Sequence, residues 1–228
     1  MTRELVFTGF EGDDGSADPD VLSALEAGDA ELLMRALAPA RLLVPIVAEP
    51  VETETVDGLT VDKQTDMAAV TLVAPDGERA LPVFTSLASL AAWDPRARPV
   101  PVTSARAGQA AVSERCDVIV VDVAGPRTSV LRPSMVWALA QQRPWLAPHL
   151  DPFVESAVAR ALVEEPAVRS HRLEEGAPTG QGILGLALVL VEGLTPAEIE
   201  QIATRVGERL ATDGELRARI DGLAFRIS

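Results

Sequence analysis

Short blocks of hydrophobic residues alternate with polar breaks along the chain, and the clearest block predicts a hairpin followed by a helix. An apolar run over residues 68–74 leads into Pro75-Asp76-Gly77, a sequence typical of a tight turn. The returning strand contains Pro82, which has no N–H for a sheet ladder, so we expect this strand at a sheet edge or with a bulge there. Thr85-Ser86 then offers hydroxyl caps to a helix over residues 87–93.

The other blocks of the first 147 residues predict short helices and short strands. Helices are expected after the capping residues Asp18 and Asp29, after Thr103 or Ser104, and from Pro133. Strands are expected at residues 41–47, 99–102, 117–123 and 129–131. The helix after Asp29 presents one apolar face, formed by Leu32, Leu33, Ala36 and Leu37. Because these elements show no regular βαβ repeat, they favour an α+β fold with mixed or antiparallel sheets flanked by helices.

Residues 49–66 interrupt this pattern. The segment is rich in acidic residues and threonine, has little apolar content, and contains Asp57-Gly58 in its middle. It predicts either a long acidic loop or a small exposed hairpin.

A domain boundary is expected at the proline-punctuated stretch 143–148, which separates an N-terminal domain, residues 1–147, from a C-terminal domain, residues 148–228. The second domain opens with a helix whose apolar residues have helical spacing: Val154, Ala157, Val158, Ala161 and Leu162. Strands are expected at residues 168–173, 184–191 and 223–227, and a capping box at Thr195-Pro196-Ala197-Glu198 begins the helix between the last two strands. The predicted order is therefore α-β-β-α-β.

Composition and charge narrow the class of protein. The longest uncharged apolar run, residues 182–191, has about half the length that a membrane-spanning helix needs. The first residues lack the positive charge of a signal peptide, so we expect a cytoplasmic protein with no membrane segment. A net charge of -14 argues against binding to nucleic acid. Residues 1–66 carry 15 acidic and 4 basic residues, net -11, which predicts either a solvated face or a docking surface for a basic protein partner.

No group of residues predicts a catalytic or metal centre. The single cysteine, Cys116, ends a predicted helix and precedes Asp117; both features disfavour a thiolate, so we expect a buried, inert thiol. His149 and His171 have no metal-ligand companion at useful spacing and no hydrolase motif beside them. The glycine-rich segment 176–182 lacks the lysine of a P-loop and favours a hairpin loop. We therefore expect no cofactor, no metal and no catalytic residue.

One candidate for a binding surface is left, at the end of the predicted hairpin. It comprises Phe84, Thr85 and Ser86 together with Trp93, which ends the following helix. Burial of these residues would indicate a structural role, whereas an exposed apolar patch would indicate a docking site.

The structural residues of the first domain also resemble those of a known family. Residues 42–46 (Leu-Leu-Val-Pro-Ile), Asp66 before a strand, Asp76-Gly77, and residues 81–86 with Trp93 ending the helix form an arrangement similar to the N-terminal domain of the SseB family, the bacterial "enhanced serine sensitivity" proteins. The α-β-β-α-β tail is similar to the separate C-terminal domain of that family. The resemblance implies the two-domain fold; it transfers no catalytic residue, because the molecular activity of the family is not established.

The sequence leaves three functions open. The leading hypothesis is a cytoplasmic, non-enzymatic interaction or regulatory protein, with a protein partner bound through the acidic N-terminal region. The alternative is a small-molecule sensor or enzyme of amino-acid or sulfur metabolism, with a pocket between the domains near the linker and residues 126–134. A third possibility, a sulfur carrier, would require a reactive Cys116.

Overall fold

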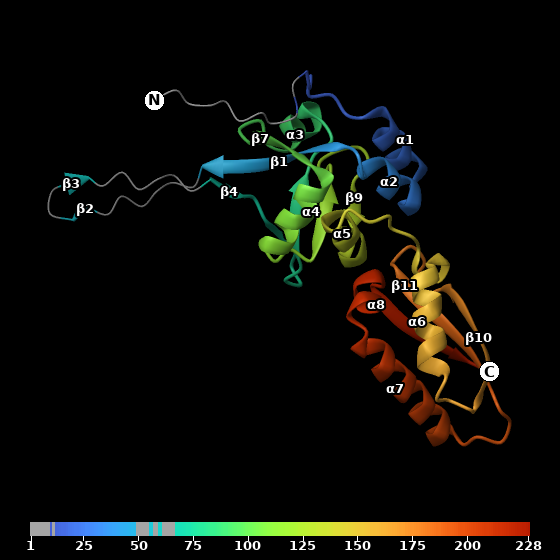
Figure 1. Cartoon of the computed structure of the whole chain (residues 1–228). Helices are drawn as coiled ribbons and strands as arrows, with labels where there is room; N and C mark the ends of the chain where they lie inside the picture. Colours follow the sequence, from blue (N-terminus) through green and yellow to red (C-terminus); the bar gives the residue numbers. More distant parts are fainter. Residues whose placement is uncertain (1–9, 11, 49–54, 57–58, 61–66) are drawn as a thin grey trace.

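The computed structural model describes residues 10, 12–48, 55–56, 59–60 and 67–228, and its fold is α+β, as predicted (Figure 1). The elements gather in two groups, one before residue 148 and one after it, which we call the N-terminal part and the C-terminal part. None of the described helices has the length and apolar character that a membrane-spanning segment needs.

The N-terminal part contains two main sheets that meet at one backbone bridge. The first is antiparallel, with the order β4 (Met67–Ala69), β1 (Arg41–Ala48), β7 (Arg98–Thr103). The second has the order β5 (Leu72–Val73), β6 (Arg79–Val83), β8 (Val118–Val121), β9 (Ser129–Leu131), and its β6–β8 pair is parallel. Leu43 of β1 and Phe84, directly after β6, exchange two backbone hydrogen bonds of 2.8 Å, which join the sheets.

The predicted hairpin is confirmed, with one change in its first strand. β5 and β6 pair antiparallel, and the turn between them has a 2.9 Å hydrogen bond from the Ala74 N–H to the Glu78 carbonyl and a left-handed Gly77. The apolar run over residues 68–74, however, divides between the two sheets. Its start belongs to β4, which pairs with β1, and only Leu72 and Val73 belong to the hairpin.

Pro82 does not lie in an edge strand, so that prediction is wrong. β6 pairs with β8 over residues 80–83 and with β5 at Arg79 and Ala80, which places it inside the sheet. The N–H and C=O groups of successive residues in a strand point alternately toward its two neighbours in the sheet. Those of Phe84 bond to Leu43 and therefore point away from β8. Pro82 faces the same side as Phe84, beyond the end of β5. Its missing N–H therefore interrupts no ladder of the described strands.

Residues 49–66 lie mostly outside the described residues. The described exceptions are β2 (Thr55–Val56) and β3 (Leu59–Thr60), which pair antiparallel, as the hairpin alternative predicts.

Local capping signals fix the helices of the N-terminal part. These are α1 (Pro19–Ala27), α2 (Ala30–Leu37), α3 (Leu87–Trp93), α4 (Ser104–Ser113) and α5 (Pro133–Ala140), and the first four have the side-chain caps Asp18, Asp29, Ser86 and Thr103. One face was predicted wrongly: in α2, Leu32 is 43% exposed, and Met34 is buried in its place. The helix is rotated so that the stripe of Leu33, Met34 and Leu37 faces the core.

The C-terminal part has the predicted α-β-β-α-β order with one additional helix. A 3-10 turn, η1 (Pro148–Leu150), precedes α6 (Pro152–Leu162), β10 (Val168–Glu175), β11 (Ile183–Leu190), α7 (Pro196–Thr212), α8 (Gly214–Arg219) and β12 (Gly222–Ile227). β11 is central, antiparallel to β10 and parallel to β12, and residues 176–182 connect β10 to β11 as a hairpin loop, as predicted. The additional helix, α8, has six residues, is capped by Asp213 directly after α7, and was not expected from the sequence.

The described core residues form separate clusters in the two parts. The largest lies between α1, α2, α4, α5 and the N-terminal sheets, and a small one around Leu43, Phe84 and Leu90 adjoins β1. Another packs α6, α7 and α8 on one face of the β10–β11–β12 sheet. The division into domains at residues 147 and 148 stays a prediction, and the clusters are consistent with it.

Glu165 ties α6 to α7 within the C-terminal part. Its carboxylate accepts two hydrogen bonds from Arg205, at 2.9 and 2.8 Å, and lies 2.9 Å from Arg209. Hydrogen bonding from Arg205, assisted by both positive charges, holds the pKa of this buried carboxyl below its ordinary value. Glu165 is therefore a structural ion-pair residue.

Candidate functional site

The residues of the predicted binding surface lie together but mostly inside the protein. Phe84 is 0% exposed and Thr85 is 3% exposed. Ser86 caps α3, and the partly buried Trp93 packs its ring 5.3 Å from that of Phe84. These contacts are structural, and a binding role for the four residues stays a prediction.

A buried carboxylate lies behind this cluster, where the parallel strands β6 and β8 end. Asp122 follows β8 with a left-handed backbone (φ 52°), and its side chain accepts hydrogen bonds from the Thr85 N–H at 2.9 Å and the Thr85 hydroxyl at 2.7 Å. Arg41 donates to the Thr85 carbonyl at 2.9 Å. Each oxygen of Asp122 thus has a donor, and the pair fixes the turn from β6 into α3.

The two histidines lie in different environments. His149 lies in η1, where its Nδ1 atom is buried and has no hydrogen-bond partner among the described residues. His171 is exposed on β10. Among the residues that the structure describes, no group of three or more histidine, cysteine, aspartate or glutamate side chains could hold a metal ion.

Cys116 is buried, as the sequence predicts, and we expect its thiol to react slowly. Burial raises the pKa of this thiol, and the Thr71 hydroxyl is 4.0 Å from the sulfur. A raised pKa lowers the thiolate fraction at neutral pH, so iodoacetamide should modify the native protein at least about tenfold more slowly than the urea-unfolded protein at the same pH. Mass spectrometry of the time course measures both rates. Equal rates would contradict this prediction and reopen the sulfur-carrier hypothesis.

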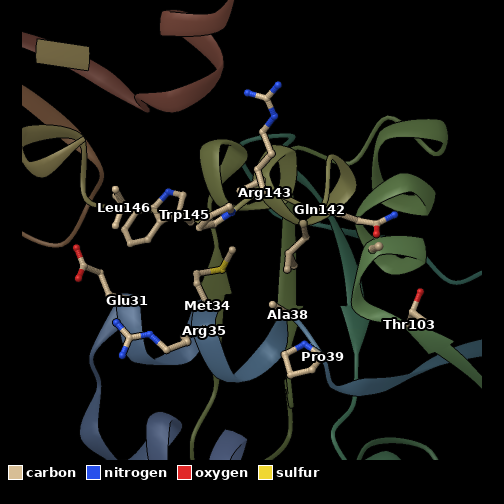
Figure 2. Close-up of a pocket in the computed structure, with 14 residues that line it drawn as sticks. Glu31, Met34, Arg35, Ala38, Pro39, Thr103, Gln142, Arg143, Trp145 and Leu146 are labelled. Atoms are coloured by element: carbon tan, nitrogen blue, oxygen red, sulfur yellow. The ribbon is translucent and has the colours of Figure 1, made fainter. Parts of the chain in front are cut away.

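The structure contains a cleft that the sequence analysis did not predict, with a volume of about 760 Å³ (Figure 2). It lies between α2, the start of α4, the end of α5 and the segment 142–146, which we call the linker. Met34, Ala138 and Leu139 contribute apolar surface, and Trp145 forms a wall. Arg143, Pro144, Trp145 and Leu146 fall in the stretch predicted to be a domain boundary, and no local motif marks the other lining residues as a site.

The end of α5 positions the linker over the cleft. Gln142 has a left-handed backbone (φ 54°), its N–H donates to the Leu139 carbonyl at 3.0 Å, and the Arg143 N–H donates to the Ala138 carbonyl at 2.9 Å. This pair of hydrogen bonds is a Schellman motif, in which glycine usually occupies the left-handed position. Pro144 follows and ends the helical path, so that Trp145 reaches the cleft.

Polar groups lie at both ends of the cleft. Glu31 and Arg35 project from α2 at one end, and Thr103 and Gln142 lie at the other (Figure 2). Arg143 lines the cleft with its stem, whereas its guanidinium pairs with Glu215 of α8 at 2.8 Å. The cleft therefore combines apolar walls with a few polar groups, which is the usual character of a small-molecule site.

Comparison with protein-family models matches residues 20–138 to the SseB protein N-terminal domain. The chain belongs to the SseB family. The matched span includes the α2 side of the cleft, and the wall from Leu139 to Leu146 follows it. No curated protein and no solved structure matched the chain. The likeness of the C-terminal part to the second SseB domain stays a prediction.

A polar chain connects the cleft of this SseB-family protein to its C-terminal part. The Trp145 Nε1–H donates to the Ser134 hydroxyl at 3.0 Å, and the Ser134 N–H and hydroxyl both donate to the Asp221 carboxylate at 2.8 Å. Arg132 pairs with Asp221 at 3.2 Å. The N-cap position of α5 has no side-chain cap of its own, so Asp221 supplies that cap from the C-terminal part. We call these four residues the latch.

The neighbouring C-terminal loop leaves room for the latch. Gly182 has a left-handed backbone (φ 66°), and a side chain there would collide with Asp221. The Asp221 N–H donates to the Gly182 carbonyl at 2.9 Å. Glycine is therefore needed at this position because two chain segments approach each other closely there.

A cation–π contact from Arg219 to Trp137 and the ion pair between Arg143 and Glu215 extend the contact between the two parts. The Arg219 guanidinium lies 5.4 Å from the centre of the Trp137 ring and 4.6 Å from that of Phe153, and it pairs with Asp151 at 2.7 Å. The residues that line the cleft all belong to the N-terminal part, and none of them comes from the segment 126–134, whose Arg132 and Ser134 bind Asp221 instead. A pocket between the domains stays a prediction.

Proposed function

We propose that this SseB-family protein is a non-enzymatic regulatory protein that binds a small molecule in the cleft beside the linker. The observation that carries the proposal is the position of Trp145, which forms a wall of the cleft and donates a hydrogen bond to Ser134 of the latch. A ligand that moves Trp145 acts directly on the contact between α5 and Asp221. Occupancy of the cleft is thereby communicated to the C-terminal part.

The size and lining of the cleft support binding rather than catalysis. Its volume of about 760 Å³ lies within the range of small-molecule sites, about 300–1,000 Å³. Its lining residues include no serine, cysteine or histidine, the side chains on which most nucleophilic and acid–base mechanisms depend. The carboxylate that lines the cleft belongs to Glu31, and it accepts a hydrogen bond of 3.2 Å from the Ala147 N–H.

A blocked cleft tests the proposal. A thermal-shift panel of amino acids and other small metabolites should contain a compound that raises the melting temperature of the full chain. Ala38→Phe, at an exposed cleft position, should abolish this shift, whereas Ala159→Phe, at an exposed position on α6, should leave it intact. Hydrogen exchange of the Ser134 amide should change on binding. If no compound changes the melting temperature, or if Ala38→Phe leaves the shift intact, the proposal is wrong.

A protein partner for the acidic N-terminal region is the second candidate function. Asp14, Asp18 and Asp20 are exposed at the start of the described chain, and they favour a partner with a basic surface. Affinity capture of the full chain from its host, compared with a variant carrying asparagine at these three positions, tests this candidate. A partner retained equally by the variant would contradict it.

A further inference from the structure

Two opposite charges line the same end of the cleft without neutralising each other. Glu31 and Arg35 are one helical turn apart on α2, a spacing at which such side chains commonly form an ion pair. Here the Glu31 carboxylate accepts the Ala147 N–H at 3.2 Å. Within the described ranges, no ion pair links Arg35 to another residue. Both charges are therefore available to a ligand at this end of the cleft (Figure 2).

The surface next to this charged pair is apolar. Met34 lies between Glu31 and Arg35 in sequence, and its side chain points from α2 toward Trp145 (Figure 2). Met34 is 3% exposed and Leu139 is 4% exposed, so these walls are held firmly by the core beneath them. The cleft continues past them toward Thr103, which leaves room for a long or aromatic side chain.

We infer that the ligand of the cleft is a zwitterionic amino acid with a large apolar side chain. The inference rests on the proposed function of the cleft and specifies its ligand class. Because Glu31 and Arg35 line the same end of the cleft, an anion bound there is repelled by Glu31 and a cation bound there is repelled by Arg35. A zwitterion offers its ammonium to Glu31 and its carboxylate to Arg35, and both contacts are charge-assisted hydrogen bonds.

The apolar side chain of this ligand lies on Met34 and against Trp145. Such contact removes apolar surface of both partners from water and places the ligand against the ring that donates to the latch. The charged end sets the orientation of the ligand, and the apolar length selects large side chains over small ones. Glycine and serine, with little apolar surface, should therefore bind more weakly than phenylalanine.

Four related probes separate the contributions of the two charges. They are L-phenylalanine, its amide, N-acetyl-L-phenylalanine and N-acetyl-L-phenylalaninamide, which carry both charges, only the ammonium, only the carboxylate, or neither. Isothermal titration calorimetry with the full chain measures each affinity. L-phenylalanine should bind at least about tenfold more tightly than any other probe, because each lost charge removes a charge-assisted hydrogen bond.

Matched variants assign each charge to its residue. Arg35→Gln should reduce the affinity for L-phenylalanine about tenfold. This variant should then bind L-phenylalanine no more tightly than the amide of L-phenylalanine. Glu31→Gln should bind L-phenylalanine no more tightly than N-acetyl-L-phenylalanine. The side-chain oxygen of the glutamine still accepts the Ala147 N–H in this variant. Arg169→Gln on β10 and Glu155→Gln on α6, both exposed and outside the cleft, should change neither preference.

The outcomes distinguish this inference from the proposed function. Equal affinities for the four probes would overturn the zwitterion inference and leave the cleft as a binding site. The inference would also fall if none of the probes bound while another compound of the thermal-shift panel bound in an Ala38→Phe-sensitive way. If neither the probes nor the panel bound, both the inference and the proposed function would be wrong.

Discussion

Replacing Phe84 with alanine is expected to lower the free energy of unfolding by about 3–5 kcal/mol, the usual cost of deleting a buried aromatic side chain. Phe84 is 0% exposed, stacks with Trp93 and lies directly at the bridge between the two N-terminal sheets. Its truncation would leave a cavity among Leu43, Leu90 and the Trp93 ring. Urea unfolding monitored by circular dichroism measures the effect.

Val112→Ala serves as the comparison for this loss of stability. Val112 is 61% exposed on α4, so its truncation should change the free energy of unfolding by no more than about 0.5 kcal/mol. If Phe84→Ala were as stable as Val112→Ala, the packing described for the sheet junction would be incorrect. Phe84 and Trp93 would then again be candidates for a docking surface.

Local signals in the sequence predicted most of the helices and strands because the interactions that fix them are local. Asp18, Ser86 and Thr195 each cap the helix that follows within three residues, and the hydrogen bonds that the sequence implies are present. The turn at Gly77 is of the same kind. Such contacts depend on spacing along the chain, and spacing is visible in a sequence.

The position of Pro82 and the face of α2 were predicted wrongly because they depend on packing between distant segments. Whether Pro82 lies at an edge is decided by β8, which arrives about forty residues later along the chain and pairs with β6. Whether Leu32 or Met34 faces inward is decided by which elements surround α2. A single hydrophobic pattern allows both rotations of that helix.

The cleft and the latch could not be predicted either, and the physical reason is the same, because both depend on contacts between distant segments. Glu31 and Trp145 are separated by more than one hundred residues, and nothing in either local sequence indicates that both line one cavity. Asp221-Gly222 has the composition of a turn, yet Asp221 caps a helix that begins at Pro133. The left-handed backbone of Gln142, which turns the chain toward the cleft, could not be predicted either, because glutamine is not a residue type that indicates such a turn.

Asp221→Ala is expected to weaken the contact between the two parts of the chain by about 3 kcal/mol. The substitution leaves the Arg132 guanidinium and the Ser134 N–H without their acceptor, and the Arg132 and Asp221 side chains are only 15% and 6% exposed. Loss of one member of a buried ion pair and loss of a helix cap both contribute to this cost. Hydrogen exchange of the amides at the start of α5, Ser134 above all, should become faster.

Asp221→Asn separates the roles of charge and of hydrogen bonding in the latch. The amide oxygen still accepts the Ser134 N–H, whereas the charge that attracts Arg132 is gone, so this variant should lie between the parent protein and Asp221→Ala. Glu192→Ala, which removes an exposed acid after β11, should exchange like the parent. If the Ser134 amide of Asp221→Ala remained as protected as in the parent, Asp221 would not hold α5. Ligand binding at Trp145 would then have no route through the latch to the C-terminal part.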